Sequence, residues 1–388
     1  MGADAERRPG ILVLFGTRPE AIKLAPVVRA LAQRGGEIDV RVVSTGQHDE
    51  LLDSALSSLD MRIDEDLGIM RPNQDLYDIG IESLGRLRTL FRSLQPEVVV
   101  VQGDTATVFY GSLAAFYEHA RVAHVEAGLR SRNKWAPFPE EVYRRLADVL
   151  SDLYFAPTAG ARDNLLTEGV PGDRVHVTGN TVVDAVQSLA EARQPLVDPA
   201  LDEILNSGRR IVLITVHRRE SFGRPVREIF AALRALATTH PEDLFVYPVH
   251  PNPNVRRPAA DMLSDTNNFK LLEPLRYSDL VRVLSRSHLV LTDSGGIQEE
   301  APSFGVPVLV LREVTERPEG VAAGVAELVG TSGERIVRLG TKLLEDSEAH
   351  SRMSKAKNPY GDGSAGERIA DILLHQTLGK PRQTEDWS

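Results

Sequence analysis

Residues 11–34 read ILVLFGTRPEAIKLAPVVRALAQR, which is an apolar run, a short polar turn and a helical stretch. The apolar residues 11–16 predict a β-strand, and the spacing of apolar residues over 20–34 predicts a helix. Pro19 suits the first turn of that helix, because its missing N–H would have no partner there. The stretch therefore predicts one strand–turn–helix unit.

The same unit recurs along both halves of the chain. In the first half, further strands are predicted at 40–44, 97–102, 122–125, 153–156 and 175–178, and a long helix at 74–94. In the second half, strands are predicted at 211–216, 244–249, 270–272, 289–292 and 308–311. Strands that alternate with helices are typical of α/β proteins with parallel sheets.

The length of 388 residues predicts two domains. Weak periodicity and two prolines over 191–203 place the boundary between about 180 and 205. We predict an N-terminal domain of residues 1–185, joined by a final helix at 364–378, and a C-terminal domain of residues 186–363. The polar tail after Gly379 is predicted to fray.

Composition excludes several classes of function. The chain has no cysteine, which rules out disulfides, thiolate metal sites and a cysteine nucleophile. A net charge of −10 argues against a nucleic-acid-binding surface, although locally converging cations could still bind a small anion. The charged residues 1–10 lack the apolar core of a signal peptide, and no apolar stretch approaches the ~18–20 residues of a transmembrane helix. We therefore expect a cytoplasmic protein without a membrane partner.

Cofactor motifs are also missing. The first strand is not followed by GxGxxG or GxxxxGK[ST], so a nicotinamide cofactor and a P-loop both lose support. HExxH and EF-hand spacings do not occur, so we expect no protein-ligated metal.

Residues 293–300, DSGGIQEE, carry the most telling local pattern. They follow an apolar strand and open a helix, whose free N–H groups favour a phosphate. Gly295 and Gly296 would let a ligand approach the backbone, and Glu300, about one turn on, could accept hydrogen bonds from ribose hydroxyls. The alternative interpretation is a serine cap followed by a glycine that packs strand against helix.

Two groups of charged residues stand at other predicted strand ends. Arg18 and Lys23 in GTRPEAIK, and His217 in HRRE, could bind an anion, or they could be solvated residues without a ligand. Three acids lie at or near strand ends of the first half and could act as acid and base, or could simply be caps: Asp104 in QGDT, Glu126 in HVEAG and Glu140 in PFPEE. The segment REVTERPEG (312–320) could order a loop or be a surface ion-pair cluster.

These segments form an ordered set with GTRPEAIKLAP, TGQH, QGDT, HVEAGLR, PFPEE, HRRE, YPVHPNP, DSGGIQEEAPSFG, REVTERPEG and NPYGDG. The set resembles the non-hydrolysing UDP-N-acetylglucosamine 2-epimerases in order, from about residue 11 to 375. The resemblance implies the GT-B architecture, in which two Rossmann-like domains form an active site in the cleft between them. It also implies a homodimer, and a product that feeds polysaccharide or antibiotic biosynthesis.

The resemblance implies interconversion of UDP-N-acetylglucosamine and UDP-N-acetylmannosamine without a cofactor. The proton at C2 is removed while UDP leaves C1, and UDP then adds back to the 2-acetamidoglucal. The acid/base group would be Asp104, Glu126 and Glu140, without an assignment of which is acid and which is base. The motifs carry over the remaining substrate-binding residues as Arg18, Lys23, Arg144, His217, Leu275, Leu280, Ser294, Gly295, Gly296, Glu300 and Arg317. Lys23 and His217 also belong to the catalytic group. Leu275 and Leu280 would flank the uracil, although an aromatic residue is usual at the position of Leu280.

Bacterial members of the family often have an allosteric site for a second UDP-N-acetylglucosamine. Its residues would be Gln47, Glu50, Asn73, Gln74, Glu140, Arg218 and His250. Glu50 replaces a usual Gln and Asn73 a usual Arg, and both departures weaken anion binding. The sequence therefore predicts weak or absent activation by substrate.

Three other functions remain open at this stage. A hydrolysing epimerase would release N-acetylmannosamine and UDP. A GT-B glycosyltransferase would need an acceptor pocket, and GTRPEAIK and HVEAGLR are not its usual motifs. A catalytically silent UDP-sugar sensor would keep Arg18 and Glu300 but have broken acids, whereas Asp104, Glu126 and Glu140 are all present.

Overall fold

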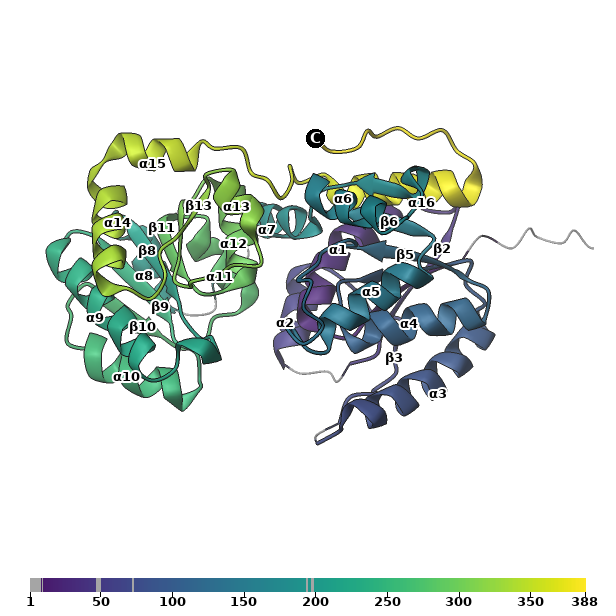
Figure 1. Ribbon diagram of the computed structural model, residues 1–388, viewed down its shortest axis with the longest axis horizontal. Helices are drawn as coiled ribbons and strands as arrows, with labels where there is room; N and C mark the ends of the chain where they lie inside the picture. The colour runs from purple at the N-terminus through teal and green to yellow at the C-terminus, as the bar shows by residue number, and fades with distance from the viewer. Residues whose placement is uncertain (1–7, 9, 47–49, 72, 193–194, 197–198) are drawn as a thin grey trace, which may run out of the picture. The chain divides into compact units, whose positions relative to one another are not determined.

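The computed structural model describes residues 8, 10–46, 50–71, 73–192, 195–196 and 199–388. The chain forms two compact units, which we describe one at a time (Figure 1). Unit 1 comprises Met1–Ala185 and Gly361–Ser388, and unit 2 comprises Val186–Tyr360. No helix within the described ranges is long and apolar enough to cross a bilayer.

Unit 1 is built on a seven-stranded parallel sheet with the order β3-β2-β1-β4-β5-β6-β7. Its strands are β1 (Gly10–Phe15), β2 (Asp39–Ser44), β3 (Glu65–Asp66), β4 (Val98–Gln102), β5 (Arg121–Val125), β6 (Leu153–Ala156) and β7 (Val175–Val177). Its helices are α1 (Arg18–Gln33), α2 (Glu50–Ser58), α3 (Leu76–Leu94), α4 (Ala106–Tyr117), α5 (Glu140–Leu150), α6 (Ala159–Thr167), η1 (Gly172–Arg174), the first part of α7 (Thr181–Ala192) and α16 (Ala365–Leu378).

Unit 2 repeats the architecture with a six-stranded parallel sheet of order β10-β9-β8-β11-β12-β13. Its strands are β8 (Ile211–Thr215), β9 (Leu244–Pro248), β10 (Phe269–Leu272), β11 (Ser287–Thr292), β12 (Val308–Val310) and β13 (Ala326–Leu328). Its helices are α8 (Pro199–Asn206), η2 (Arg219–Ser221), α9 (Arg224–Thr239), α10 (Pro253–Leu263), α11 (Tyr277–Leu284), α12 (Gly295–Glu300), η3 (Ala301–Phe304), α13 (Pro318–Ala322), α14 (Gly333–Glu345) and α15 (Ser347–Ser354).

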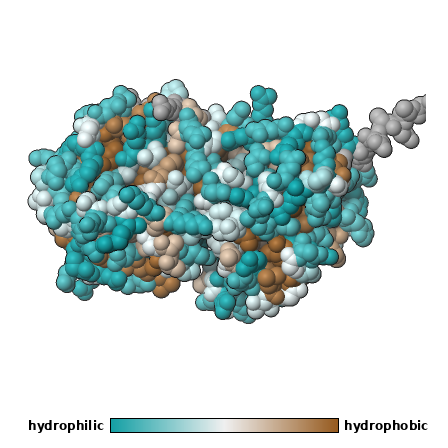
Figure 2. Space-filling view, turned by 90° about the horizontal axis from the view of Figure 1, so that it is seen from above, coloured by the Kyte–Doolittle hydropathy of each residue, from teal (hydrophilic) through white to brown (hydrophobic). Residues whose placement is uncertain are grey.

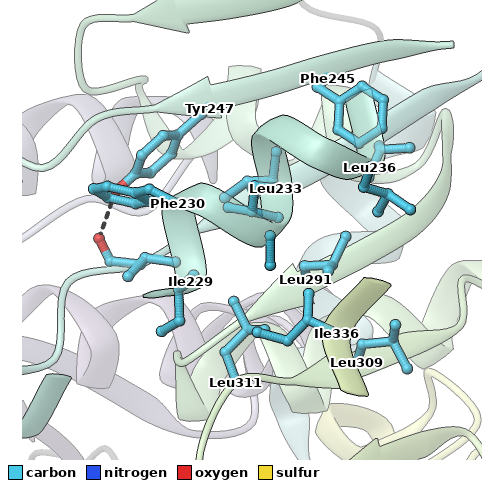
Figure 3. Packing of buried hydrophobic residues seen from close by; sticks show 14 of the residues in the cluster. Ile229, Phe230, Leu233, Leu236, Phe245, Tyr247, Leu291, Leu309, Leu311 and Ile336 are labelled. Carbon is cyan, nitrogen blue, oxygen red and sulfur yellow. Dashed lines mark hydrogen bonds between the residues drawn. The ribbon is translucent and has the colours of Figure 1, made fainter. Parts of the chain in front are cut away.

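The sheet of unit 2 is buried on both faces. Alternate residues of β11 and β12 enter opposite clusters: Leu291 and Leu309 face α9 and α14, whereas Val290 and Val308 face α8 and α11. In the first cluster, apolar side chains of α9 interdigitate with β9 and β11, and the Tyr247 hydroxyl donates to a backbone carbonyl (Figure 3). Burial on both faces explains why these strands are short continuous apolar runs rather than alternating ones.

The predicted α/β fold class and its parallel sheets are confirmed. The predicted strands lie within one or two residues of the observed ones, but β3 and β13 were not predicted. β3 has two residues, both acidic, and β13 has three, so neither offers enough apolar sequence for a pattern.

The prediction that the tail frays after Gly379 is wrong. Asp371 of α16 accepts hydrogen bonds from the backbone N–H groups of Gln383 and Thr384, each at 2.7 Å. The backbone N–H of Trp387 donates to the Val177 carbonyl at 2.8 Å. Because β7 is an edge strand of the sheet, this bond occupies an otherwise unpaired carbonyl. The tail after Gly379 is therefore held by backbone hydrogen bonds, although its composition is polar.

Candidate functional site

Both sheets have a topological switch point, where the strand order reverses beside the first strand of the unit. In unit 1 this point lies between β1 and β4, and in unit 2 it lies between β8 and β11. Ligands of open α/β sheets bind outside the carboxyl ends of the strands at such a point. At the first switch point lie the loop that begins at Gly16 and the QGDT loop. At the second lie the loops that begin at Val216 and Asp293.

Glu126 follows β5 in unit 1 and is tied to two neighbours. The Lys23 Nζ lies 2.5 Å from its Oε2, and the Gln102 Nε2 donates to the same oxygen at 2.9 Å. The Lys23 and Glu126 side chains are 12% and 10% exposed, so the pair is largely removed from water. The backbone φ of Glu126 is +68°, an uncommon conformation for a residue with a side chain, and such outliers concentrate at functional sites.

Asp104 follows β4 and is paired with a cation from α5. The Arg144 Nη2 donates to the Asp104 Oδ2, and the Arg144 Nη1 also lies 3.4 Å from the Glu141 Oε2. Residues Gln102 and Val125 are register partners on β4 and β5, so Asp104 and Glu126 follow adjacent strands at the same edge of the sheet. The structure thus brings together two of the three predicted acids, each with its own cation.

The third predicted acid, Glu140, has a different setting from its neighbour Glu141. Glu140 is half-buried at the start of α5, and it makes no hydrogen bond or ion pair with any residue that the structure describes. Glu141 is buried and accepts from the backbone N–H groups of Ser131 and Arg132 at 2.9 and 3.0 Å. Glu141 therefore holds the preceding loop in place, a role that the motif PFPEE did not reveal.

Glu20 is a second residue that sequence reasoning missed. Its side chain is buried and accepts from the Gly16 backbone N–H at 3.1 Å and from the Thr105 hydroxyl at 2.6 Å. Burial raises the pKa of Glu20 to about 7. Glu20 therefore connects the GTRPE loop to the QGDT loop. Arg18, two residues before it, is half-buried and has no hydrogen bond or ion pair among the described residues.

Asp293 organises the switch point of unit 2. It is fully buried, and its carboxylate accepts from the backbone N–H of His217 at 2.9 and 3.1 Å and from that of Arg218 at 2.9 Å. Burial lowers the pKa of His217, whose ring also stacks on that of His250 with 5.6 Å between the ring centres. Charge-assisted hydrogen bonds to two successive amides fix the loop that carries His217.

The segment after Asp293 begins the short helix α12. The Ser294 side chain makes no capping hydrogen bond in the described structure, so the interpretation of Ser294 as a helix cap is not supported. Glu300 is buried, and the Tyr277 hydroxyl donates to its Oε1 at 3.0 Å. Leu275 and Leu280 are half-buried and pack against the apolar cluster beneath. Tyr277 was not predicted, because nothing in its local sequence connects it with a residue 23 positions away.

The segment REVTERPEG is held by ion pairs in which Arg312 is buried and its partners Glu220 and Glu316 are exposed. Arg312 contacts Glu220 at 2.6 Å and Glu316 at 2.7 Å, and its side chain is 8% exposed. Burial alone would raise the pKa of Glu316, but the hydrogen bonds and charge of Arg312 lower it to about 2. The Arg317 Nε donates to Glu299 of α12. The loop interpretation is therefore favoured over a solvated surface cluster.

The residues of the predicted allosteric site are dispersed over both units. Gln47 lies outside the described residues, and Glu50 begins α2. Asn73 is exposed with φ of +65°, and the side-chain amide of Gln74 is bonded within its own loop, to Ile69 and Arg71. Arg218 and His250 belong to unit 2, where the His250 Nδ1 accepts from the Asn252 backbone N–H at 3.1 Å. Within the described residues, no group of three or more His, Asp or Glu could hold a metal ion.

Two parallel α/β units with charged loops at their switch points form the class of open α/β proteins that bind ligands at the carboxyl ends of their strands. Comparison with known proteins identifies the family. The family model for UDP-N-acetylglucosamine 2-epimerase matches residues 29–374. The UDP-N-acetylglucosamine 2-epimerase of Bacillus subtilis is 47% identical over 364 residues, which cover 94% of each chain.

Solved structures agree with this result. A Listeria monocytogenes homologue with 41% identity superimposes with a TM-score of 0.92 and covers 98% of this chain and all of its own. The UDP-GlcNAc 2-epimerase of Neisseria meningitidis, solved with bound UDP-GlcNAc, has 45% identity and a TM-score of 0.84, covering 94% of this chain and 99% of its own. The chain belongs to the UDP-N-acetylglucosamine 2-epimerase family and is an epimerase.

Proposed function

We propose that this protein interconverts UDP-N-acetylglucosamine and UDP-N-acetylmannosamine by elimination and re-addition of UDP. A base removes the proton from C2 while the C1–O bond to UDP breaks, and the electron pair of the C–H bond forms the C1–C2 double bond of 2-acetamidoglucal. UDP then re-forms the bond to C1 while an acid protonates C2 on the opposite face. The sequence of steps returns every atom and proton, so no redox cofactor is required.

The observation that carries this proposal is the pair of carboxylates at the edge of the unit 1 sheet. Asp104 and Glu126 follow adjacent strands, and each is paired with a cation, Arg144 and Lys23. Inversion at C2 needs a group that takes a proton on one face and another that returns it on the other face. Carboxylates in partly buried surroundings suit this task, because their environments can separate their pKa values. Glu140 is the third candidate, and we do not assign acid and base among the three.

The C2 proton is not activated by a neighbouring carbonyl, so the reaction depends on stabilising the departing UDP. We assign this task to the cations Arg18 and Arg317, to the His217 imidazole as a hydrogen-bond donor, and to the backbone N–H groups of Ser294 to Gly296. Glu300 would accept hydrogen bonds from the ribose hydroxyls, and Leu275 and Leu280 would flank the uracil. The Neisseria meningitidis structure with bound UDP-GlcNAc supports the choice of substrate class.

An isotope experiment tests the mechanism. The protein is incubated with UDP-N-acetylglucosamine in deuterated water, and the products are followed by NMR. We expect deuterium at C2 of both UDP-sugars, because the proton that returns comes from a group that exchanges with solvent. Epimerised product without deuterium at C2 would exclude proton abstraction. Free UDP that accumulates in step with turnover would instead identify a hydrolysing epimerase.

We further propose that activation by a second substrate molecule is weak or absent. Asn73 and Glu50 replace residues that would favour a diphosphate, and the Gln74 amide is bonded within its own loop. Initial rates at rising UDP-N-acetylglucosamine should then follow a hyperbola. Clear sigmoidal kinetics would contradict this expectation.

We also propose a homodimer formed through unit 1. The adjacent helices α3, α4 and α5 lie on one face of its sheet (Figure 1) and expose the large apolar side chains Tyr77, Ile81, Phe116, Tyr117 and Val149. The face seen in Figure 2 is mainly hydrophilic, with apolar side chains in separate patches. Large exposed apolar patches mark interaction sites. Val149→Asp, at a position 80% exposed, should shift the mass measured by light scattering from dimer to monomer. A wild-type monomer would exclude the dimer.

A further inference from the structure

The motif HVEAGLR contributes Glu126 to the proposed reaction, but two of its other polar residues are buried without an assigned role. The His124 side chain is fully buried in β5, and that of Arg130 is 3% exposed. Buried ionisable groups are costly unless they are paired and hydrogen-bonded. A structural role of His124 and Arg130 beside the Asp104 and Glu126 carboxylates would account for their burial.

The two residues belong to a continuous chain of hydrogen bonds. Glu168 and Asp148 both accept from the Arg130 Nη2, at 2.8 and 2.7 Å. The other Asp148 oxygen lies 2.7 Å from the His124 Nδ1, and the His124 Nε2 lies 2.7 Å from the carbonyl oxygen of Gly103. The chain therefore ends on the peptide group directly before Asp104.

The ring of His124 is held at both ends. Its Nε2 faces the Gly103 carbonyl oxygen, and its Nδ1 faces the Asp148 carboxyl group. Burial alone would raise the pKa of Asp148, but the neighbouring His124 and Arg130 lower it. The two contacts therefore fix the orientation of the ring between Asp148 and the Gly103 peptide group.

The turn that carries Asp104 is held against β5 through Gly103. Gly103 has a φ of +85° and its N–H donates to the Val125 carbonyl at 3.0 Å. Its carbonyl is held by His124, so both hydrogen-bonding groups of this residue are fixed by neighbouring positions of β5. Glu126 follows two residues after His124 on the same strand end. One buried ring therefore links the turns of both carboxylates.

We propose that His124, held by the Asp148–Arg130 pair, is a positioning residue that fixes the Gly103–Asp104 turn relative to Glu126. The proposal rests on the proposed function, because it assigns Asp104 and Glu126 to the proton transfers. Displacing a reacting group by about 1 Å can cost on the order of 100-fold in rate, so the effect should appear in kcat.

The test compares His124→Gln with His240→Gln. His240 is a matched control, because it is also buried, bonds to a backbone carbonyl and lies 3.3 Å from a carboxylate, but it belongs to unit 2 and to no proposed site. For both variants we measure kcat, KM, UDP affinity by calorimetry, melting temperature and hydrogen exchange of the amides of residues 103–105. A second, milder variant is Asp148→Asn.

We expect kcat of His124→Gln to fall by about 10- to 100-fold, with KM and UDP affinity changed much less and with faster exchange at residues 103–105. Asp148→Asn should show the same pattern in smaller measure, and His240→Gln should leave kcat unchanged. Unchanged kcat in His124→Gln, or a parallel loss of UDP affinity and melting temperature, would each overturn the proposal. If the wild-type protein did not epimerise the substrate, the proposed function would fail, whereas amide exchange at residues 103–105 would still decide the role of His124.

Discussion

The two switch points use charge in opposite ways. In unit 1, the carboxylates Asp104 and Glu126 are paired with Arg144 and Lys23. In unit 2, the buried acid Asp293 accepts from the backbone N–H groups of His217 and Arg218, and its Oδ1 also lies 3.4 Å from the His217 Nδ1. The His217 side chain remains 35% exposed. Unit 1 therefore presents neutralised pairs, whereas unit 2 presents an ordered loop with an accessible imidazole.

The difference fits a division of labour between chemistry and binding. Paired carboxylates are held in one geometry, which suits groups that must exchange a proton with a fixed carbon atom. A loop fixed through its backbone leaves its side chains available for an anion such as diphosphate. Variants in unit 1 should therefore change turnover, and variants in unit 2 should change UDP affinity.

The largest effect is expected at Glu126. Glu126→Gln keeps the shape of the side chain but removes its charge and its ability to take a proton, so kcat should fall by roughly 10²–10⁴-fold. UDP affinity, measured by calorimetry, should stay close to that of the wild type. Glu118→Gln, which removes an exposed carboxylate of the same unit from its pair with Arg92, serves as control. A variant that keeps more than half of the wild-type kcat would contradict the assignment.

The next largest effect is expected at Asp293, and it should be an effect on binding. Asp293→Asn replaces an acceptor oxygen by a donor that faces a backbone N–H, and leaving a buried group unsatisfied costs about 1–3 kcal/mol. We expect UDP affinity to fall by about 10-fold or more, as the loop of His217 loses its anchor. Asp243→Asn is the control, because Asp243 is equally buried in unit 2 but pairs with Arg210 before β9. If both variants weaken UDP equally, the effect is one of stability alone.

A third prediction concerns how the stability of each unit depends on pH. Burial raises the pKa of Glu20 in unit 1 to about 7, from an ordinary value of 4.5. The folded state therefore binds this proton more tightly than the unfolded chain, and the resulting stability is present below pH 4.5 and lost as the pH rises through 7. In unit 2, Glu316 has a pKa of about 2, so its contribution is present above pH 4.5 and is lost only as the pH falls toward 2.

Hydrogen exchange in α1 and β1 at pH 5 and pH 8 measures this contrast. Glu20→Gln mimics the protonated side chain, so the variant should gain on the order of 1–3 kcal/mol relative to the wild type between these pH values. Exchange in β8 and α9 of unit 2 should show no such difference between the two proteins. Parallel pH curves for wild type and variant in unit 1 would show that the folded protein does not retain the Glu20 proton.

The smallest effect is expected at Tyr277. Tyr277→Phe removes the hydroxyl that donates to the Glu300 Oε1, and one hydrogen bond contributes about 0.5–1.5 kcal/mol. UDP affinity should fall about 2- to 10-fold, since Glu300 would then orient less well toward the ribose. The loss of affinity caused by Tyr277→Phe should be smaller when it is measured with 2′-deoxyuridine diphosphate. An equal loss with both nucleotides would separate Tyr277 from ribose recognition.

Local sequence was sufficient to predict most of the strands and the loops that follow them. The pattern of residues 11–34 predicts a strand, a turn and a helix, and the structure has them at Gly10–Phe15 and Arg18–Gln33. The loops GTRPE, QGDT, HRRE and DSGG each follow a strand that borders a switch point. This succeeds because strand and helix periodicities, and the turn residues between them, act over a few positions of the chain.

The partners of those residues could not be predicted in the same way. Lys23 meets Glu126 across 103 positions and Glu20 meets Thr105 across 85, because the order of β1, β4 and β5 in the sheet brings their loops together. The motif PFPEE likewise does not tell which glutamate faces inward, and the structure buries Glu141 rather than Glu140.

The sequence by itself determined that this chain forms two parallel α/β units with charged loops after their strands, since short-range periodicity and turn residues encode each element locally. Only the tertiary structure decided which charges are paired, which carboxyl retains its proton and which backbone group each buried acid holds. Those properties depend on burial and on contacts between distant strands, and neither is a function of local sequence.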